Sequence, residues 1–145
     1  MAVSAKLYGK FFSALADKTV DLNSDSFKVA LATSSYTPDQ DAHDFFNDIT
    51  NEVTGTGYTA GGVALGSPTF SYTGGSNTFA WDANDVAWTS STITARYAII
   101  YDTTPGSSST NPLVAYVDFG ADVSTTAGTF TITWDAAGIF TVVVS

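Results

Sequence analysis

Apolar and polar residues alternate with a period of two, or form short apolar runs, along most of the chain. Such alternation places one set of side chains on each face of a β-strand. Runs that predict strands occur at 27–32, 69–73, 78–81, 92–101, 112–119, 129–134 and 139–144. Segments rich in Gly, Asn, Ser, Thr and Pro separate these runs, as is typical of sandwiches and barrels. The pattern predicts one mainly β domain spanning 1–145, an antiparallel β-sandwich or barrel with two short helices near the N-terminus.

Two neighbouring runs are predicted to form a hairpin. The run 69–73 places Phe70 and Tyr72 on one face, and a second run follows at 78–81. The four residues 74–77, Gly-Gly-Ser-Asn, are typical of a tight turn between paired strands. Further along the chain, the run 92–101 becomes apolar on both faces near its end. This pattern predicts a central strand that is buried on both sides.

Both helices are predicted in the first third of the chain. Leu7, Phe11 and Leu15 recur at four-residue spacing, which is the apolar stripe of an amphipathic helix over residues 4–16. The second helix, over 38–48, begins at the sequence Thr-Pro-Asp-Gln. This sequence combines an N-cap Thr, a Pro at the first helical position and a Gln at the capping-box position.

The charges of the chain are unevenly distributed. Its formal net charge is −9, yet four of its five cations lie within residues 1–28, and Arg96 is the fifth. Nucleic acids and anionic lipids are bound mainly through Lys and Arg, so we expect binding to neither. The first twenty residues contain Lys6 and Lys10 and no sustained apolar run, so neither a signal peptide nor a membrane span is expected.

Residue types that catalysis requires are scarce. The chain has no cysteine, which excludes thiol chemistry, disulfides and zinc-thiolate sites. His43 is the only histidine, it precedes Asp44, and no Gly-x-Ser-x-Gly sequence accompanies it. We therefore predict a protein that is not an enzyme and has no cofactor.

Two other kinds of site remain open. Trp81, Trp88 and Trp134, with carboxylates nearby, could line a carbohydrate-binding surface or a small glycosidase groove. Oxygen ligands for a Ca²⁺ ion are present in two clusters, 82–85 and 39–44. Neither cluster has the spacing of an EF-hand loop.

The glycine-rich segment 55–62 lacks both the G-x-G-x-x-G spacing and the lysine of phosphate-binding loops. We expect it instead to allow a close approach of backbones, within one subunit or between subunits. Tyr and Trp side chains dominate the energetic hot spots of interfaces. The residues predicted to contribute to an interface are Tyr36, Tyr58, Gly61, Gly62 and Trp88.

Several segments resemble a family of small virion proteins of tailed bacteriophages, described as head decoration or minor structural proteins. The resemblance is carried by SSYTPDQD at 34–41 and GTGYTAGG at 55–62, within a longer similar stretch over 28–65. It continues at 91–102 and 130–140. The resemblance implies a component of a phage particle, and it implies no catalytic residue.

These observations lead to a capsid decoration protein as the expected function. It would bind the outer surface of the shell of major capsid protein, or other virion proteins, as a homo-oligomer such as a trimer. A component of the tail tube, fibre or tip is the alternative within the same particle. A carbohydrate-binding module is the alternative from another class. The expected location is the virion, after synthesis in the cytoplasm of a bacterial host.

Overall fold

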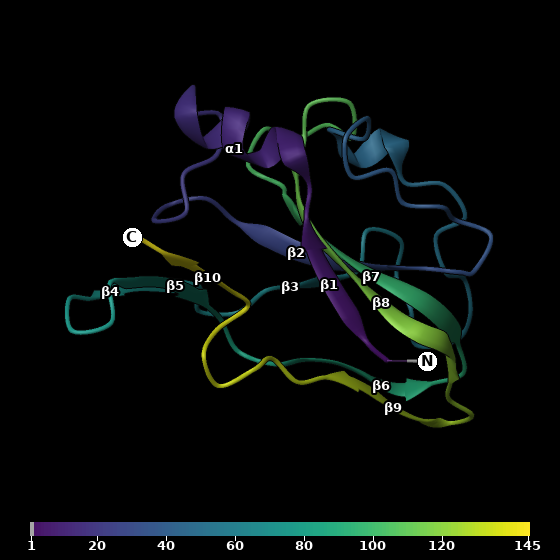
Figure 1. Ribbon diagram of the computed structural model, residues 1–145. Helices are drawn as coiled ribbons and strands as arrows, with labels where there is room; N and C mark the ends of the chain where they lie inside the picture. The colour runs from purple at the N-terminus through teal and green to yellow at the C-terminus, as the bar shows by residue number, and fades with distance from the viewer. Residues whose placement is uncertain (1) are drawn as a thin grey trace.

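The computed structural model describes residues 2–145, which form ten strands, one α-helix and one 3-10 helix (Figure 1). The elements are β1 (Ser4–Leu7), α1 (Gly9–Ala16), β2 (Phe27–Ala32), the 3-10 helix η1 (Phe46–Asp48), β3 (Val63–Ala64), β4 (Thr69–Thr73), β5 (Thr78–Asp82), β6 (Val86–Ser91), β7 (Thr94–Asp102), β8 (Leu113–Ser124), β9 (Gly128–Ile132) and β10 (Phe140–Val143). Every pairing between these strands is antiparallel. The predicted class, a mainly β protein with antiparallel sheets, is confirmed.

Five strands form the largest sheet, in the order β1-β8-β7-β2-β3. Strand β7 lies in its middle, where it pairs with β8 on one side and with β2 on the other. The β2–β7 register runs from Phe27 opposite Asp102 to Ala32 opposite Tyr97. The predicted central strand is thus confirmed, since only a strand with partners on both sides and layers on both faces needs apolar residues on each face.

Both faces of this sheet are covered. On one face, residues such as Val29 and Ile100 belong to a core cluster that also includes Trp81, Trp88 and Phe130 of the smaller sheets. On the other face, a second cluster joins sheet residues to Tyr8 and Tyr36, which lie outside the sheet. The residues of this second cluster are Tyr8, Ala30, Ala32, Tyr36, Ile99, Tyr101, Leu113 and Tyr116.

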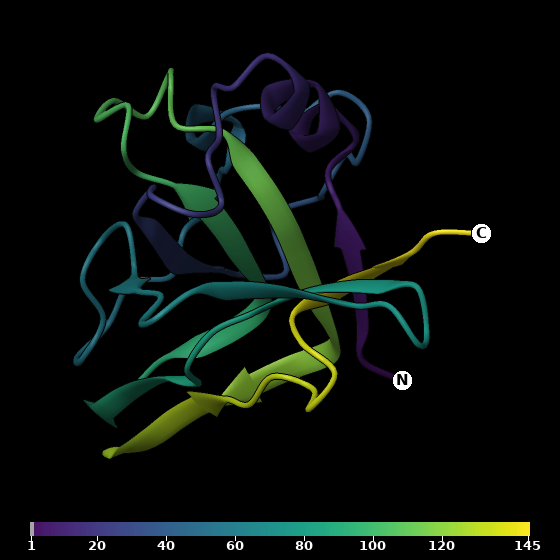
Figure 2. The ribbon, with the colours of Figure 1, turned by 90° about the vertical axis from the view of Figure 1, so that its left-hand side faces the viewer.

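The remaining strands form two small sheets, β10-β5-β4 and β6-β9. The predicted hairpin is confirmed as β4 and β5, whose register begins at Thr73 opposite Thr78. Figure 2 shows this hairpin and β10 extending together to one side of the molecule. In β6–β9 the register shifts between Trp88 and Ser91, and Ser90 within this stretch has φ +50.

The helix predicted over 4–16 is wrong in its first half. Residues Ser4–Leu7 form β1, and α1 begins only at Gly9. Apolar and polar side chains alternate through Val3, Ser4, Ala5, Lys6 and Leu7, which suits a strand that pairs with β8. No helix in the described part of the chain is long and apolar enough to cross a membrane.

The helix predicted over 38–48 is wrong, because only the three-residue η1 forms at its end. Two aspartates bind the backbone locally: Asp39 Oδ1 accepts from the N–H groups of Asp41 and Ala42, and Asp48 Oδ2 accepts from that of Asp44. The Asp39 bonds are those of an N-cap, and one helical turn follows, with the His43 N–H donating to the Asp39 carbonyl. The Asp48 side chain occupies the Asp44 N–H that the next turn would use. The segment also bonds to residues far along the chain, with the Phe46 N–H donating to the carbonyl of Asn111. These tertiary contacts override the local helix-start signal.

Candidate functional site

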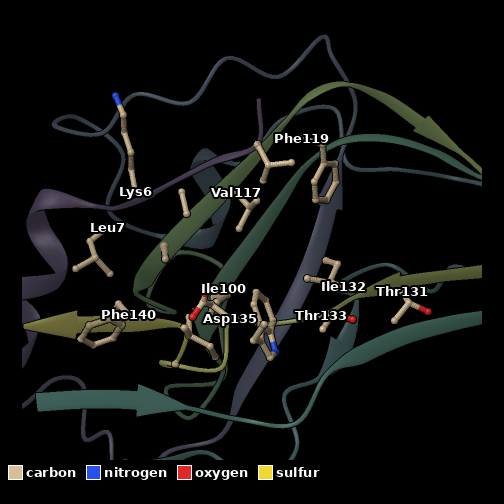
Figure 3. A pocket seen from close by; sticks show the side chains of 16 residues that line it. Lys6, Leu7, Ile100, Val117, Phe119, Thr131, Ile132, Thr133, Asp135 and Phe140 are labelled. Atoms are coloured by element: carbon tan, nitrogen blue, oxygen red, sulfur yellow. The ribbon is translucent and has the colours of Figure 1, made fainter. Parts of the chain in front are cut away.

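The structure contains an apolar cavity of about 430 Å³ at the β1 end of the large sheet. Strands β1 and β8 form one wall, and the chain from the end of β9 to the start of β10 forms the other (Figure 3). Its lining residues are Val3, Ala5, Lys6, Leu7, Ile100, Ala115, Val117, Phe119, Thr131, Ile132, Thr133, Trp134, Asp135, Gly138, Ile139 and Phe140. We call this cavity the β1 groove.

Strand alternation makes the sheet wall of the β1 groove apolar. In the β1–β8 register Ala5 lies opposite Val117, and Leu7 lies opposite Ala115, so these side chains share the face that lines the groove. Lys6 belongs to the other parity of the strand. Its side chain extends away from the cavity in Figure 3. The groove therefore presents hydrocarbon to whatever enters it.

The opposite wall is held in place by hydrogen bonds to the chain between β5 and β6. The Trp134 N–H donates to Asp85 Oδ1, and the Trp134 indole N–H donates to the carbonyl of Asn84, both at 3.0 Å. Asp135, the only carboxylate of the groove, accepts the N–H of Ala137 in a local turn. One carboxylate and one outward lysine do not make an acid–base pair, so the groove is suited to binding apolar groups.

An open strand edge borders the same groove. Strand β1 is at the end of the five-stranded sheet and pairs only with β8. A strand edge of this kind exposes backbone N–H and C=O groups that an extended segment can bond. The β1 groove therefore combines an apolar wall with free backbone groups, which are the two features that bind an extended apolar peptide.

The single histidine lies elsewhere, in a hydrogen-bonded chain with two tyrosines. Tyr8 Oη lies 2.9 Å from Tyr36 Oη, which lies 2.9 Å from His43 Nδ1. The Asp39 N–H donates to the same Nδ1, so this nitrogen acts as an acceptor. Burial raises the pKa of Tyr36 to about 12, which keeps its hydroxyl protonated. A buried, protonated tyrosine bonded to an acceptor histidine stabilises the fold and offers no activated nucleophile.

Two of the three tryptophans are buried. Trp81 is fully buried and packs edge-on against Phe27, while Trp88 is 2% exposed and packs against Phe130. Only Trp134 is half-exposed. Among residues 2–145, no group of three or more His, Asp or Glu side chains is placed to hold a metal ion.

The structure brings together three of the five residues predicted to contribute to an interface. Tyr58 stacks on Trp88 at 6.2 Å between ring centroids, and the Tyr58 hydroxyl and the Gly61 N–H bond the same oxygen of Glu52. Gly62 lies next in the chain and packs against β2, whereas Tyr36 belongs to the separate cluster with Tyr8.

Burial decides what these residues can contact. Tyr36 and Trp88 are 1% and 2% exposed, so neither side chain can contact a second subunit while the chain keeps this fold. Tyr58, Gly61 and Gly62 are half-buried. Any role in an interface falls to this loop rather than to the two buried aromatic rings.

Tyr58 fixes the loop 55–62 to β2. Its hydroxyl accepts the N–H of Leu31 at 3.0 Å and donates to Glu52 Oε1 at 2.6 Å. Burial, followed by the bond to Glu52, raises the pKa of Tyr58. The Tyr101 hydroxyl fastens the end of the same loop by donating to the carbonyl of Gly61 at 2.7 Å.

We expect Tyr58→Phe to lower the free energy of unfolding by about 1–3 kcal/mol, because the Leu31 N–H loses its acceptor while the ring remains in place. Tyr72→Phe is the matched control, since the Tyr72 hydroxyl bonds only to Asn77 in an exposed position and its loss should change stability by less than about 0.5 kcal/mol. Urea unfolding measures both. Equal stabilities of the two variants would show that the Tyr58 hydroxyl does not stabilise the loop.

Two apolar surfaces were not predicted as sites. The β1 groove depends on Ala5 and Leu7 being in a strand, with Val3 just before it, and the period-two alternation of 3–7 was the signal for it. The second surface contains Phe70 and Tyr72 of β4, which are 51% and 57% exposed. Sequence placed both side chains on one face but did not show that this face is uncovered.

Comparison of the chain with protein-family models, with curated proteins and with solved structures gave no match.

Proposed function

We propose that the protein is a non-enzymatic structural component of a tailed-phage particle, and specifically a capsid decoration protein on the outer surface of the major capsid protein shell. The observation that carries the proposal is the resemblance of 34–41 and 55–62 to small phage virion proteins. Residues of both segments have structural roles, such as Tyr36 in the core and Gly62 against Val29. They are suited to specifying a shared fold rather than a shared active site.

We infer that the β1 groove is the surface that contacts the shell. Its occupant in this proposal is an extended apolar segment of the capsid protein, paired with the open edge of β1. Lys6 indicates that this segment carries an acidic residue, because Lys6 lies on β1 and no ion pair involves it among the described residues. An acidic residue of the segment, next to Lys6 on the face away from the groove, would complement its charge.

The proposed architecture is a sandwich, with the five-stranded sheet as one layer and the two small sheets together as the other. Val29 of the large sheet belongs to the same core cluster as Trp81 and Phe130 of the small sheets, which supports this arrangement. In the particle the protein would act as a homo-oligomer bound to capsid protein, after synthesis in the host cytoplasm. The net charge of −9 supports a position away from packaged DNA.

A tail tube, fibre or tip component is the second candidate, because the resemblance covers virion proteins without distinguishing head from tail. A carbohydrate-binding module has weaker support. Its two principal aromatic residues, Trp81 and Trp88, are buried and cannot stack on a sugar.

Electron cryo-microscopy of particles produced without this protein tests the proposal. We expect shells that lack a surface density, with tails intact. Missing tails would instead favour the tail role. Absence of the protein from wild-type particles would overturn both roles.

Adding purified variants to such particles tests the β1 groove. Ala5→Trp fills the groove from β1 and should abolish decoration. Ser4→Trp, the matched control, places the same side chain on the other face of β1 and should decorate normally. Normal decoration by Ala5→Trp would exclude the groove as the contact.

A further inference from the structure

Strand β4 is an edge strand without the usual protection against pairing. It lies at the end of the sheet β10-β5-β4, and all five of its residues are exposed. Edge strands are commonly protected by a lysine, an inward charge, a proline or a bulge. The sequence Thr-Phe-Ser-Tyr-Thr of β4 has none of these, and its register with β5 is regular from Thr69 to Thr73. A free edge of this kind is available to another strand.

The sequence of β4, Thr-Phe-Ser-Tyr-Thr, is symmetric about Ser71 except that Phe70 is matched by Tyr72. In an antiparallel pairing of two copies centred on Ser71, each Thr69 lies opposite the other copy's Thr73, and each Phe70 lies opposite the other copy's Tyr72. Aromatic pairs and Thr–Thr pairs are among the favourable cross-strand combinations. The edge is therefore complementary to itself, which points to a second copy of the chain as the occupant.

The distribution of charge also favours a second copy at this edge. Two chains of net charge −9 repel each other over most of their surfaces. No charged residue occurs from Val53 to Trp81 or from Ala136 to Ser145, so Asp82 is the only charge in the three strands of this sheet. Contact through β4 keeps the acidic surfaces of two copies apart.

The aromatic face of this sheet borders a second cavity, of about 470 Å³. Phe70 and Phe79 line it from the sheet, and Leu15 lines it from α1. The loop after α1 contributes Lys18, Val20, Asp21, Leu22 and Asn23, so one lysine and one aspartate of opposite charge lie at this cavity. In the symmetric pairing, Tyr72 of the second copy lies directly beside Phe70 on this face. The cavity thus leaves room next to the position where the second aromatic ring arrives.

We propose that two copies of the chain pair through β4, antiparallel and about a two-fold axis at Ser71. The result is a continuous six-stranded sheet in which β5 and β10 of each copy flank the paired β4 strands. On its aromatic face, one row joins Phe140, Trp81 and Phe70 to Tyr72, Phe79 and Val142 of the other copy. This dimer requires only the free chain and does not depend on the role in a phage particle.

Sedimentation equilibrium of the purified full chain tests the proposal, with wild type expected at twice its mass of 15.2 kDa. Ser71→Lys places two like charges opposite each other at the axis and should raise the dimer dissociation constant about tenfold or more. Thr141→Lys is the matched control, because Thr141 shares the face and the cross-strand row of Ser71 but lies two strands away on β10. It should leave the dimer intact. A monomeric or trimeric wild type, or equal effects of the two lysines, would overturn the proposal.

A single introduced cysteine tests the register. Because the chain has no cysteine, oxidised Ser71→Cys can be cross-linked only through that position. Residues opposite each other in a sheet have Cβ atoms roughly 4.5–5.5 Å apart, near the span of a disulfide. We expect a cross-linked dimer for Ser71→Cys and none for Thr141→Cys. Equal cross-linking of the two variants would exclude pairing at Ser71.

Discussion

Gly62→Ala is expected to lower the free energy of unfolding by at least about 3 kcal/mol. Gly62 has φ +78, a backbone conformation that residues other than glycine rarely adopt. A methyl group there would also overlap the carbonyl oxygen of Val29, in the middle of β2. The strain and the overlap cannot both be relieved without displacing the core strand.

Two other glycines separate these contributions. Gly106 has φ +90 with open space around its Cβ position, so Gly106→Ala should cost only the backbone strain, about 1–2 kcal/mol. Gly75 has neither feature, and Gly75→Ala should change stability by less than about 0.5 kcal/mol. Denaturant unfolding of the three variants gives the comparison. A loss for Gly62→Ala no greater than for Gly106→Ala would show that β2 yields to the added methyl group.

Asp102→Asn is expected to stabilise the protein at pH 8 by about 1–2 kcal/mol. Asp102 is fully buried at the end of β7, and burial, followed by the nearby carboxylate of Asp25, raises its pKa from the ordinary 3.8 to about 6. The folded state therefore binds more protons than the unfolded state between about pH 4 and pH 6. The stability contributed by this proton is present below pH 4 and is lost as the pH rises through 6.

The geometry permits this substitution. Asp102 Oδ1 accepts the Thr104 N–H at 2.7 Å, and an asparagine oxygen can accept the same bond. Asp102 Oδ2 has no hydrogen-bond partner, and the amide that replaces it can donate to the neighbouring carboxylate of Asp25. An uncharged amide there avoids the cost of a buried charge at high pH.

Unfolding experiments at pH 4 and pH 8 test the prediction for Asp102. Asp122→Asn is the matched control, because it removes one carboxylate from an exposed position. Other carboxylates, such as Asp39 and Asp118, have lowered pKa values and make the whole protein less stable in acid, so each variant is compared with wild type at the same pH. A gain for Asp102→Asn that is as large at pH 4 as at pH 8 would contradict the prediction.

Local sequence was sufficient for most strands because alternation is a property of each strand by itself. The predicted 27–32 is β2 as observed, and the turn at 74–77 correctly joined β4 to β5. The centre of the large sheet was also predictable. A strand covered on both faces must be apolar on both, and β7 showed this in its own residues.

The helix predictions failed where two local patterns competed. In 4–16, a four-residue spacing of Leu7, Phe11 and Leu15 overlapped an alternating stretch, and pairing with β8 decided for the strand. In 38–48, Asp39 caps one helical turn, but the Asp48 side chain bonds the Asp44 N–H and the Phe46 N–H donates to the carbonyl of Asn111, so the helix does not continue. Neither outcome is visible without the distant partner segments.

The sequence by itself determined the mainly β class, the positions of most strands along the chain, the hairpin, the acidic charge and the scarcity of catalytic residue types. Only the tertiary structure decided which apolar faces are covered. Trp88 and Phe70 are both aromatic residues in strands with an apolar–polar alternation, yet Trp88 is 2% exposed and Phe70 is 51% exposed. The physical reason is that alternation makes two faces different, whereas burial depends on whether another layer reaches that face. Trp88 of β6 packs against the large sheet, whereas β4 belongs to the hairpin that extends to one side of the molecule (Figure 2). The surface available for assembly is therefore set by packing between segments far apart in the chain.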